Sequence, residues 1–143
     1  MVSKRVLLLG VLILVTLQFF PRIERRSRAA TGGLDAPEEV LVIVQRSCFD
    51  CHSTRTRWPW YGYIAPISWL LSHDVNEARE KLNFSAWSQL AEDSQSHLAR
   101  EIVRQVERGD MPLSRYLWLH PDARLSRDEL EILRRWARTQ AKH

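Results

Sequence analysis

The residue types best suited to chemistry stand together as Cys48-x-x-Cys51-His52. Two thiols three positions apart reach the two vinyl groups along one edge of a porphyrin, and the next residue brings an imidazole to the iron as its proximal ligand. The spacing therefore predicts one covalently bound c-type haem, attached through Cys48 and Cys51, with His52 as an iron ligand. Because the chain has two cysteines, a single haem uses both thiols.

Three other kinds of site use the same residue types. A structural zinc site would take Cys48, Cys51 and a histidine as three of its ligands, but the sequence offers no second ligand pair at matching spacing. A thioredoxin-like dithiol would need a strand before the motif and a parallel sheet around it. A disulfide across the short loop suits an exported domain but gives His52 no role.

Helices must position the motif, because apolar residues recur at helical spacing along most of the chain. We expect Asp35 to cap a helix, with Glu38 three positions later, and this helix to lead directly into Cys48. Residues 55–66 hold two prolines, Gly62 and four aromatic side chains, which predicts an ordered aromatic loop.

Four further helices are expected after this loop. Apolar residues from Ile67 through Leu70 to Leu82 follow the 3.6-residue period and predict an amphipathic helix. A short helix is expected around residues 87–90.

The last two helices are marked by their ends. The apolar face that begins at Leu98 predicts a helix that Gly109 ends as a C-cap. Ser126 and Glu129 form a capping box for the final helix. Since we identify no alternating strand pattern, the predicted fold class is all-α.

The net charge of +4 belongs to the N-terminal segment. Residues 1–30 hold six basic residues and one acidic residue, which leaves 15 basic and 16 acidic residues in the remainder. A near-neutral domain lacks the basic face that would neutralise phosphates, so nucleic acid is not expected as a partner.

An apolar run begins at Val6, after Lys4 and Arg5, and reaches 18 residues when it is counted through Ile23. That length lies at the short end of the range for a membrane-spanning helix and predicts a signal anchor. A signal peptide cleaved after Ala29 is the alternative.

The chain is thus expected to have three parts: a membrane anchor over residues 1–23, a linker over residues 24–34 and a c-type haem-binding domain over residues 35–143. Because haem is attached to exported chains, we expect the domain at the cytoplasmic (inner) membrane, facing the periplasm or extracytoplasmic side.

The sequence resembles the small haem-binding domains of exported bacterial proteins, which are related to single-haem cytochromes c. The resemblance extends over about 90 residues. It implies a small cytochrome-c-like helical domain, covalent haem, an export route and ligation by methionine. The residues that carry it are Cys48, Cys51, His52, Ser53, Thr56, Trp58, Pro59, Trp60, Tyr61, Ala65, Pro66, Asn83, Phe84, Ser85, Trp87, Met111, Pro112, Tyr116, His120, Pro121, Ala123, Leu125, Ser126 and Trp136.

Met111 is the predicted sixth ligand of the iron. It follows a helix stop, precedes Pro112 and lies 59 residues beyond His52, so its thioether can approach the open face of a haem. His120 is the alternative ligand, whereas His73 is expected on a polar helix face and His97 in solvent.

The aromatic residues are expected to serve the haem in two ways. Trp58 and Trp60 are candidates for the haem edge, with their indole N–H groups offered to the propionates, and Arg55 and Arg57 are candidates for the same contact. Core packing is expected of Trp69, Trp87 and Trp136.

These inferences predict a membrane-anchored single-haem cytochrome that transfers single electrons to and from redox partner proteins. A His/Met pair fills both axial positions of the iron, which favours a carrier over an enzyme. The alternatives are a haem-based ligand sensor or a peroxidase-like enzyme with a displaceable sixth ligand, and a non-redox assembly module.

Overall fold

The computed structural model describes residues 3–19 and 33–140, and these residues form seven α-helices, three short 3₁₀ helices and no strand. The predicted all-α class is confirmed. In chain order, the elements are α1 (Lys4–Leu17), α2 (Glu38–Ser47), α3 (Phe49–His52), η1 (Trp60–Tyr63), α4 (Ile67–Lys81), η2 (Phe84–Gln89), α5 (Glu92–Glu107), α6 (Ser114–Leu117), η3 (Pro121–Ala123) and α7 (Arg127–Gln140).

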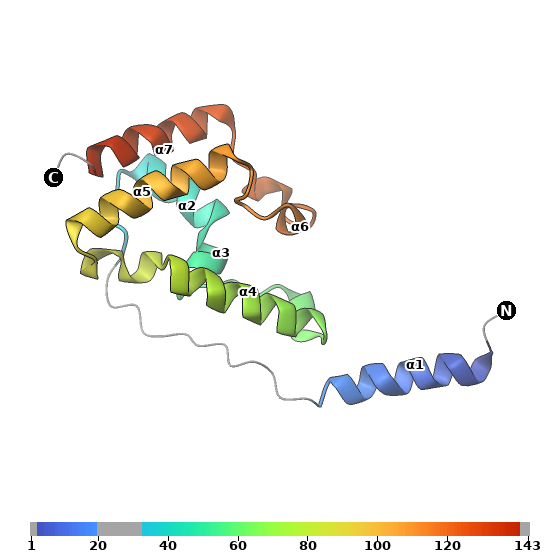
Figure 1. Cartoon of the computed structure of the whole chain (residues 1–143). Helices are drawn as coiled ribbons and strands as arrows, with labels where there is room; N and C mark the ends of the chain where they lie inside the picture. The colour runs from blue at the N-terminus through green and yellow to red at the C-terminus, as the bar shows by residue number, and fades with distance from the viewer. Residues whose placement is uncertain (1–2, 20–32, 141–143) are drawn as a thin grey trace.

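The N-terminal helix α1 stands apart from the other helices and has no buried residue (Figure 1). It is 14 residues long, and none of the described helices combines the length and the apolar character needed to cross a membrane. The expected end of the anchor at residue 23, the linker up to residue 32 and the alternative cleavage site at Ala29 lie outside the described residues.

The one-turn helix α3 links α2 to α4. Helix α5 lies along α7, α2 contacts α7, and α3 is in contact with α2, α4 and η2 (Figure 1). Helix α3 thus lies where the group of α2, α5 and α7 meets α4 and η2.

A row of aromatic rings connects α3 to the core. Phe49 stacks on Phe84 with ring centroids 5.6 Å apart, Phe84 stacks on Trp87 at 5.9 Å, and Trp87 packs against Trp136 of α7 at 5.6 Å. Phe84, Trp87 and Trp136 are buried together with apolar residues of α2, α5 and α7. As predicted, Trp87 and Trp136 belong to the core, whereas Trp69 is only half-buried and lies outside this cluster.

The predicted stop at Gly109 is confirmed. Gly109 has a φ of 74°, its N–H donates to the Val106 carbonyl, and the Asp110 N–H donates to the Gln105 carbonyl. These two bonds form a Schellman motif, which glycine favours because the left-handed backbone costs it little.

The predicted cap of the first domain helix is wrong. Helix α2 begins at Glu38 with Pro37 as its N-cap residue, and no side chain caps it. A residue before proline disfavours the helical backbone, so Ala36 stays extended and the helix cannot begin at Asp35. Glu38 and Glu39 still lie in the first turn, where acidic side chains stabilise a helix.

Residues 55–66 form the expected irregular aromatic segment, with the short helix η1 inside it. It is attached to α4 by Arg79, which donates to the Ser53 carbonyl at 2.8 Å and to the Thr56 hydroxyl at 2.7 Å. The small side chains of Ser68 and Ser72 on α4 are buried, whereas the larger Ile67 and Leu70 are exposed.

The predicted capping box of α7 is confirmed. The Ser126 N–H donates to Glu129 Oε2 at 2.8 Å, and the Glu129 N–H donates to Ser126 Oγ at 3.2 Å. The other oxygen of Glu129 accepts a hydrogen bond from Arg46 of α2 at 2.7 Å. Glu129 therefore both caps α7 and joins it to the helix that leads into Cys48.

Glu129→Gln should lower the free energy of unfolding by about 1–2 kcal/mol at pH 7. The hydrogen bond from Arg46 lowers the pKa of Glu129 from 4.5 to about 2. Because the pKa is lower in the folded state, the stabilisation is complete above pH 4.5 and is lost as the pH falls towards 2. Urea unfolding followed by circular dichroism across this range measures the difference between the two chains.

Glu131→Gln is the matched control on the same helix. Among the described residues, Glu131 pairs with Arg134 of its own helix on the exposed side, so its loss should change the unfolding free energy by less than about 0.5 kcal/mol. The assignment would be contradicted if Glu129→Gln changed the unfolding free energy no more than Glu131→Gln does. It would also be contradicted if the effect of Glu129→Gln were unchanged near pH 2.

Candidate functional site

The motif residues occupy a sharp change of helix direction. Helix α2 ends at Ser47, Cys48 has a non-helical backbone, and α3 makes one new turn. Within that turn the His52 N–H donates to the Cys48 carbonyl at 2.9 Å. Residues at positions i, i+3 and i+4 of a helical turn share a side, so Cys48, Cys51 and His52 face the same way.

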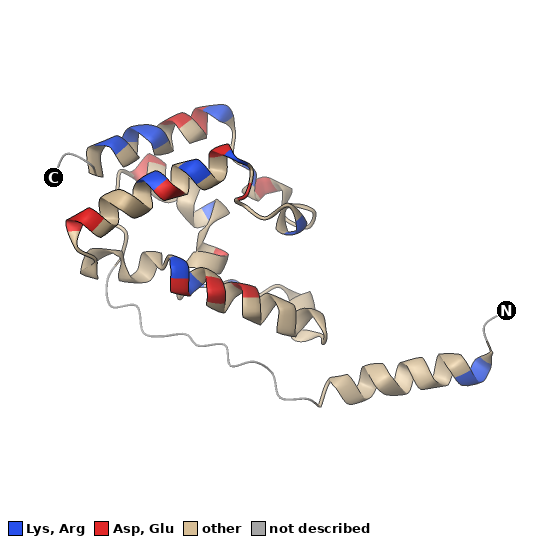
Figure 2. Cartoon of the chain, viewed as in Figure 1, with Lys and Arg blue, Asp and Glu red and all other residues tan. Residues whose placement is uncertain are grey.

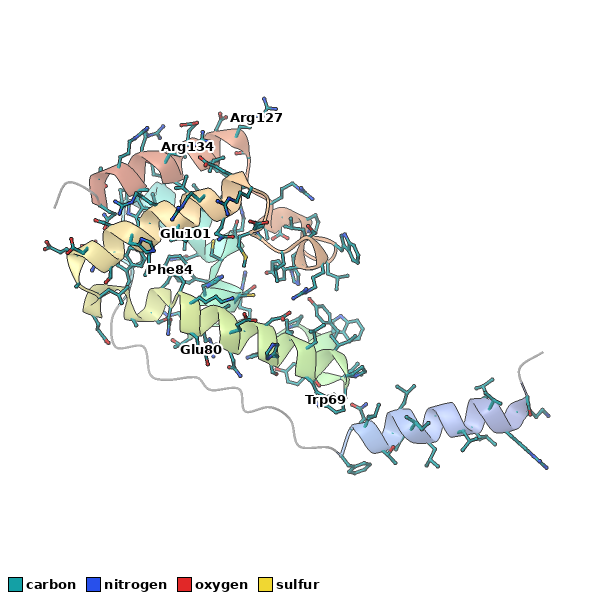
Figure 3. All side chains as sticks on the ribbon, viewed as in Figure 1. Trp69, Glu80, Phe84, Glu101, Arg127 and Arg134 are labelled. Atoms are coloured by element: carbon teal, nitrogen blue, oxygen red, sulfur yellow. The ribbon has the colours of Figure 1, made fainter. Side chains whose placement is uncertain are left out.

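The side they share is one wall of a cavity of about 650 Å³. The cavity brings Cys48, Cys51, His52 and Met111 together, although Met111 lies far along the chain. Phe84 from η2 and Glu101 from α5, both labelled in Figure 3, line two other sides. The rest of the lining comprises Ser47, Asp50, Asp74, Glu77, Ala78, Lys81, Leu82, Leu98, Ile102, Gln105, Val106, Pro112, Leu113, Arg115 and Tyr116.

The protonation state of His52 follows from its backbone contacts. Its Nδ1 lies 3.1 Å from the Ala78 carbonyl oxygen and 3.2 Å from the Leu82 carbonyl oxygen, at the end of α4. A carbonyl only accepts, so Nδ1 carries the proton and Nε2 keeps its lone pair. Burial lowers the pKa of His52, which favours the neutral imidazole that binds a metal. A carbonyl partner of this kind orients a ligating histidine.

The two thiols are free and protonated in this setting. Burial raises the pKa of Cys48 to about 12 and that of Cys51 to about 11. A redox dithiol needs the opposite shift, towards the thiolate. The described residues also lack the strand that a thioredoxin-like site requires, and they contain no group of three or more histidine, cysteine, aspartate or glutamate side chains placed to hold a metal ion.

Met111 is positioned by the end of α5 and by the next loop. Its N–H donates to the Gln105 carbonyl at 3.2 Å, directly after the turn at Gly109. Farther along, the Tyr116 hydroxyl donates to Asp50 Oδ2 at 3.0 Å. Because Asp50 lies inside the motif, this bond holds the loop of Met111 against α3.

His120 does not line the cavity. Its Nε2 lies 2.8 Å from the Tyr61 hydroxyl, and its ring stacks on Tyr116 with centroids 4.3 Å apart. His73 and His97 are exposed on α4 and α5, as expected. Among the histidines that the structure describes, His52 alone contributes to the cavity.

The residues expected to contact the haem edge do not line the cavity either. Arg57 pairs with Asp50 at 3.2 Å, and Trp60 is exposed. Arg55 and Trp58 are likewise absent from the cavity lining. Those four predictions rested on nearness in sequence, but the aromatic loop turns away from the cavity.

The cations at the rim are instead Lys81 of α4 and Arg115 of α6. Lys81 pairs with Glu77 at 2.6 Å, and Arg115 pairs with Asp74 at 2.8 Å. Sequence analysis missed both. The Glu77–Lys81 spacing of four residues indicates an ion pair on a helix, but no sequence signal indicates that this side of the helix borders the cavity.

The cavity fits a haem by the chemistry of its lining. Its apolar walls suit a flat macrocycle, its two thiols suit covalent attachment, and an imidazole nitrogen and a thioether are both ligands used for haem iron. Cations at the rim suit the propionates.

Comparison with known proteins agrees with this geometry. The chain matches the family model of the haem-binding domain over residues 12–139, which is most of its length. No curated protein and no solved structure gave a match.

The protonated state of the thiols can be tested on the chain prepared without haem. Because the pKa of Cys51 is raised to about 11, only about one thiol in a thousand is ionised at pH 8. Alkylation by iodoacetamide should therefore be slow near neutral pH and should accelerate about tenfold per pH unit up to about 11. Mass spectrometry of the modified chain measures the alkylation rates of Cys48 and Cys51.

The urea-unfolded chain is the control, since the pKa of its thiols should lie near the ordinary value of about 8.5. A folded chain whose thiols react as fast as those of the unfolded chain at pH 8 would show that the cysteines are not held in a buried wall.

Proposed function

The chain belongs to the haem-binding domain family, and from this premise we propose that it is a single-haem c-type cytochrome that transfers single electrons at a membrane. The observation that carries the proposal is the meeting of Cys48, Cys51, His52 and Met111 in one cavity. When bound there, the haem supplies an iron that alternates between the ferrous and ferric states.

In this proposal each ligand has a separate task. Cys48 and Cys51 would hold the haem covalently, each thiol through one thioether bond to a vinyl group, an addition that needs no oxidant. Nε2 of His52 would be one ligand of the iron, oriented by the carbonyls that receive its Nδ1–H. The thioether of Met111 would be the second protein ligand.

The rest of the lining sets the conditions for electron transfer. Leu82, Phe84, Leu98 and Ile102 line the cavity and would exclude water from the macrocycle, which would limit the reorganisation of solvent when the charge changes. Lys81 and Arg115 would contact the propionates, each with a carboxylate neighbour that limits its mobility.

A carrier is favoured over an enzyme because two protein ligands leave the iron without an open position. The alternative, a ligand sensor or a peroxidase-like enzyme, requires that Met111 be displaceable. Met111 lies on a loop rather than in a helix, which is compatible with its displacement from the iron, and the experiment on Met111 below tests this alternative.

We propose further that residues 1–23 attach the chain to the cytoplasmic membrane and that the haem-binding domain lies on the extracytoplasmic side. The side chains of α1 between Val6 and Val15 are apolar and exposed, and none of them is buried against the domain. The redox partners would then be proteins of that compartment or of the membrane.

The first expected result is that haem stays with the chain after extraction in acid and organic solvent. Cys48→Ala or Cys51→Ala should leave one thioether, and His52→Ala should prevent a stable haem-bound form, since the proximal ligand is lost. Mass spectrometry of the denatured chain and the absorption spectrum in pyridine report covalent attachment and haem type. His120→Ala is the control and should keep both thioethers, because His120 does not line the cavity and its ring contacts Tyr61 and Tyr116. Complete extraction of haem from the unchanged chain would refute covalent attachment.

The second expected result concerns the sixth ligand. Met111→Ala should open the iron, giving a high-spin ferric spectrum and new binding of carbon monoxide in the ferrous form. Met111→His should keep a low-spin spectrum with a lower reduction potential, because imidazole favours ferric iron more than a thioether does. Absorption spectra and redox titration measure these changes.

His120→Ala is again the comparison. If it gave the high-spin spectrum while Met111→Ala did not, the ligand would be His120. If the unchanged chain bound carbon monoxide readily, the sensor or peroxidase-like alternative would be favoured.

A further inference from the structure

The corner formed by η1 and the start of α4 exposes an unusual amount of apolar surface. Five large side chains within residues 60–70 are exposed to solvent over half their surface or nearly so: Trp60 at 75 %, Tyr63 at 46 %, Ile64 at 45 %, Ile67 at 47 % and Leu70 at 53 %. We call these five residues the apolar corner. Contiguous apolar patches on a protein surface mark sites of contact with other proteins or with membranes.

The apolar corner is also free of charge. No aspartate, glutamate, lysine or arginine occurs between Trp58 and His73, and charged residues begin at Asp74. Figure 2 shows the consequence: the half of α4 near η1 is uncharged, whereas the opposite half carries acidic and basic residues. Polarity thus changes along the axis of α4, as expected of a helix that enters an apolar medium with one end.

The apolar helix α1 is joined to the domain at this same corner. The side-chain amide of Gln18 donates to the Ala65 carbonyl at 3.3 Å, and the Ala65 N–H donates to Gln18 Oε1 at 3.1 Å. Ala65 lies between Ile64 and the start of α4, so the end of α1 is fixed beside the exposed side chains. Figure 1 shows α1 extending away from the domain at the place where α4 begins.

We propose that the apolar corner rests in the boundary between lipid headgroups and acyl chains, next to α1. The inference depends on the membrane attachment proposed above for residues 1–23. Trp60 and Tyr63 are the residue types enriched at that boundary, where one end of the ring is apolar and the other is hydrated. Ile64, Ile67 and Leu70 add apolar area that a single short helix lacks.

Such contact would fix the height and the direction of the cavity above the membrane. The residues of α4 that line the cavity begin at Asp74, seven positions after Ile67, which is about 10 Å along a helix. The cavity would therefore stand close above the headgroups with a constant orientation, within reach of a partner held in the same membrane.

Photo-crosslinking tests the proposal on the full, haem-bearing chain in vesicles of phosphatidylcholine and phosphatidylglycerol. Benzoylphenylalanine replaces Ile64 or Leu70, and in a matched control it replaces Val42, an apolar residue of α2 that is 56 % exposed. We expect covalent lipid adducts, detected by mass spectrometry, at Ile64 and at Leu70 and none above background at Val42. An unchanged haem spectrum verifies that each labelled chain is folded.

Other adducts would overturn the proposal. A product of twice the mass of the chain at Ile64 and Leu70 would show that a second copy covers the apolar corner, and the absence of any adduct would show that nothing does. Flotation of the same vesicles distinguishes the lipid contact of the apolar corner from the membrane attachment of residues 1–23. A chain that floats without a lipid adduct at the corner retains its membrane attachment and refutes the corner contact, whereas a chain that does not float refutes both.

Discussion

The stacking of Phe49, Phe84, Trp87 and Trp136 is the interaction on which the rest of the structure depends. Phe49 lies between the two cysteines, so the first ring of the row belongs to the motif itself. The row continues through η2 to Trp136 of α7, inside the core. Aromatic pairs in this arrangement contribute about 0.5–1.5 kcal/mol each beyond the area they bury. The row of rings therefore ties the position of α3 to the core.

With α3 fixed, hydrogen bonds bring the other walls of the cavity to it. The Nδ1–H of His52 donates to the Ala78 and Leu82 carbonyls at the end of α4, where the Ala78 carbonyl also accepts the Leu82 N–H. Asp50 receives the Tyr116 hydroxyl on one oxygen and Arg57 on the other. Asp50 thus connects the motif both to the aromatic loop and to the loop of Met111.

The two ends of α4 then serve different surroundings. Its C-terminal end borders the cavity through Ala78 and Lys81, while its N-terminal end carries Ile67 and Leu70 of the apolar corner. A rigid helix between the two makes the orientation of the cavity a consequence of whatever contacts the corner. In the proposed arrangement the membrane is that contact, and the attachment of haem and the attachment to lipid are coupled through one helix.

The sequence by itself determined the features that depend on near neighbours. The spacing of Cys48, Cys51 and His52 predicts a site for one haem, and the helix ends at Gly109 and Ser126 follow from local backbone and side-chain chemistry. Only the tertiary structure decided what depends on distant partners. It separated Met111 from His120, since both follow α5 in loops and only packing determines which one reaches the cavity. It placed Lys81 and Arg115, rather than Arg55 and Arg57, at the rim of the cavity. It also left Ile67 and Leu70 exposed, because helical periodicity shows that a face is apolar but not what will cover it.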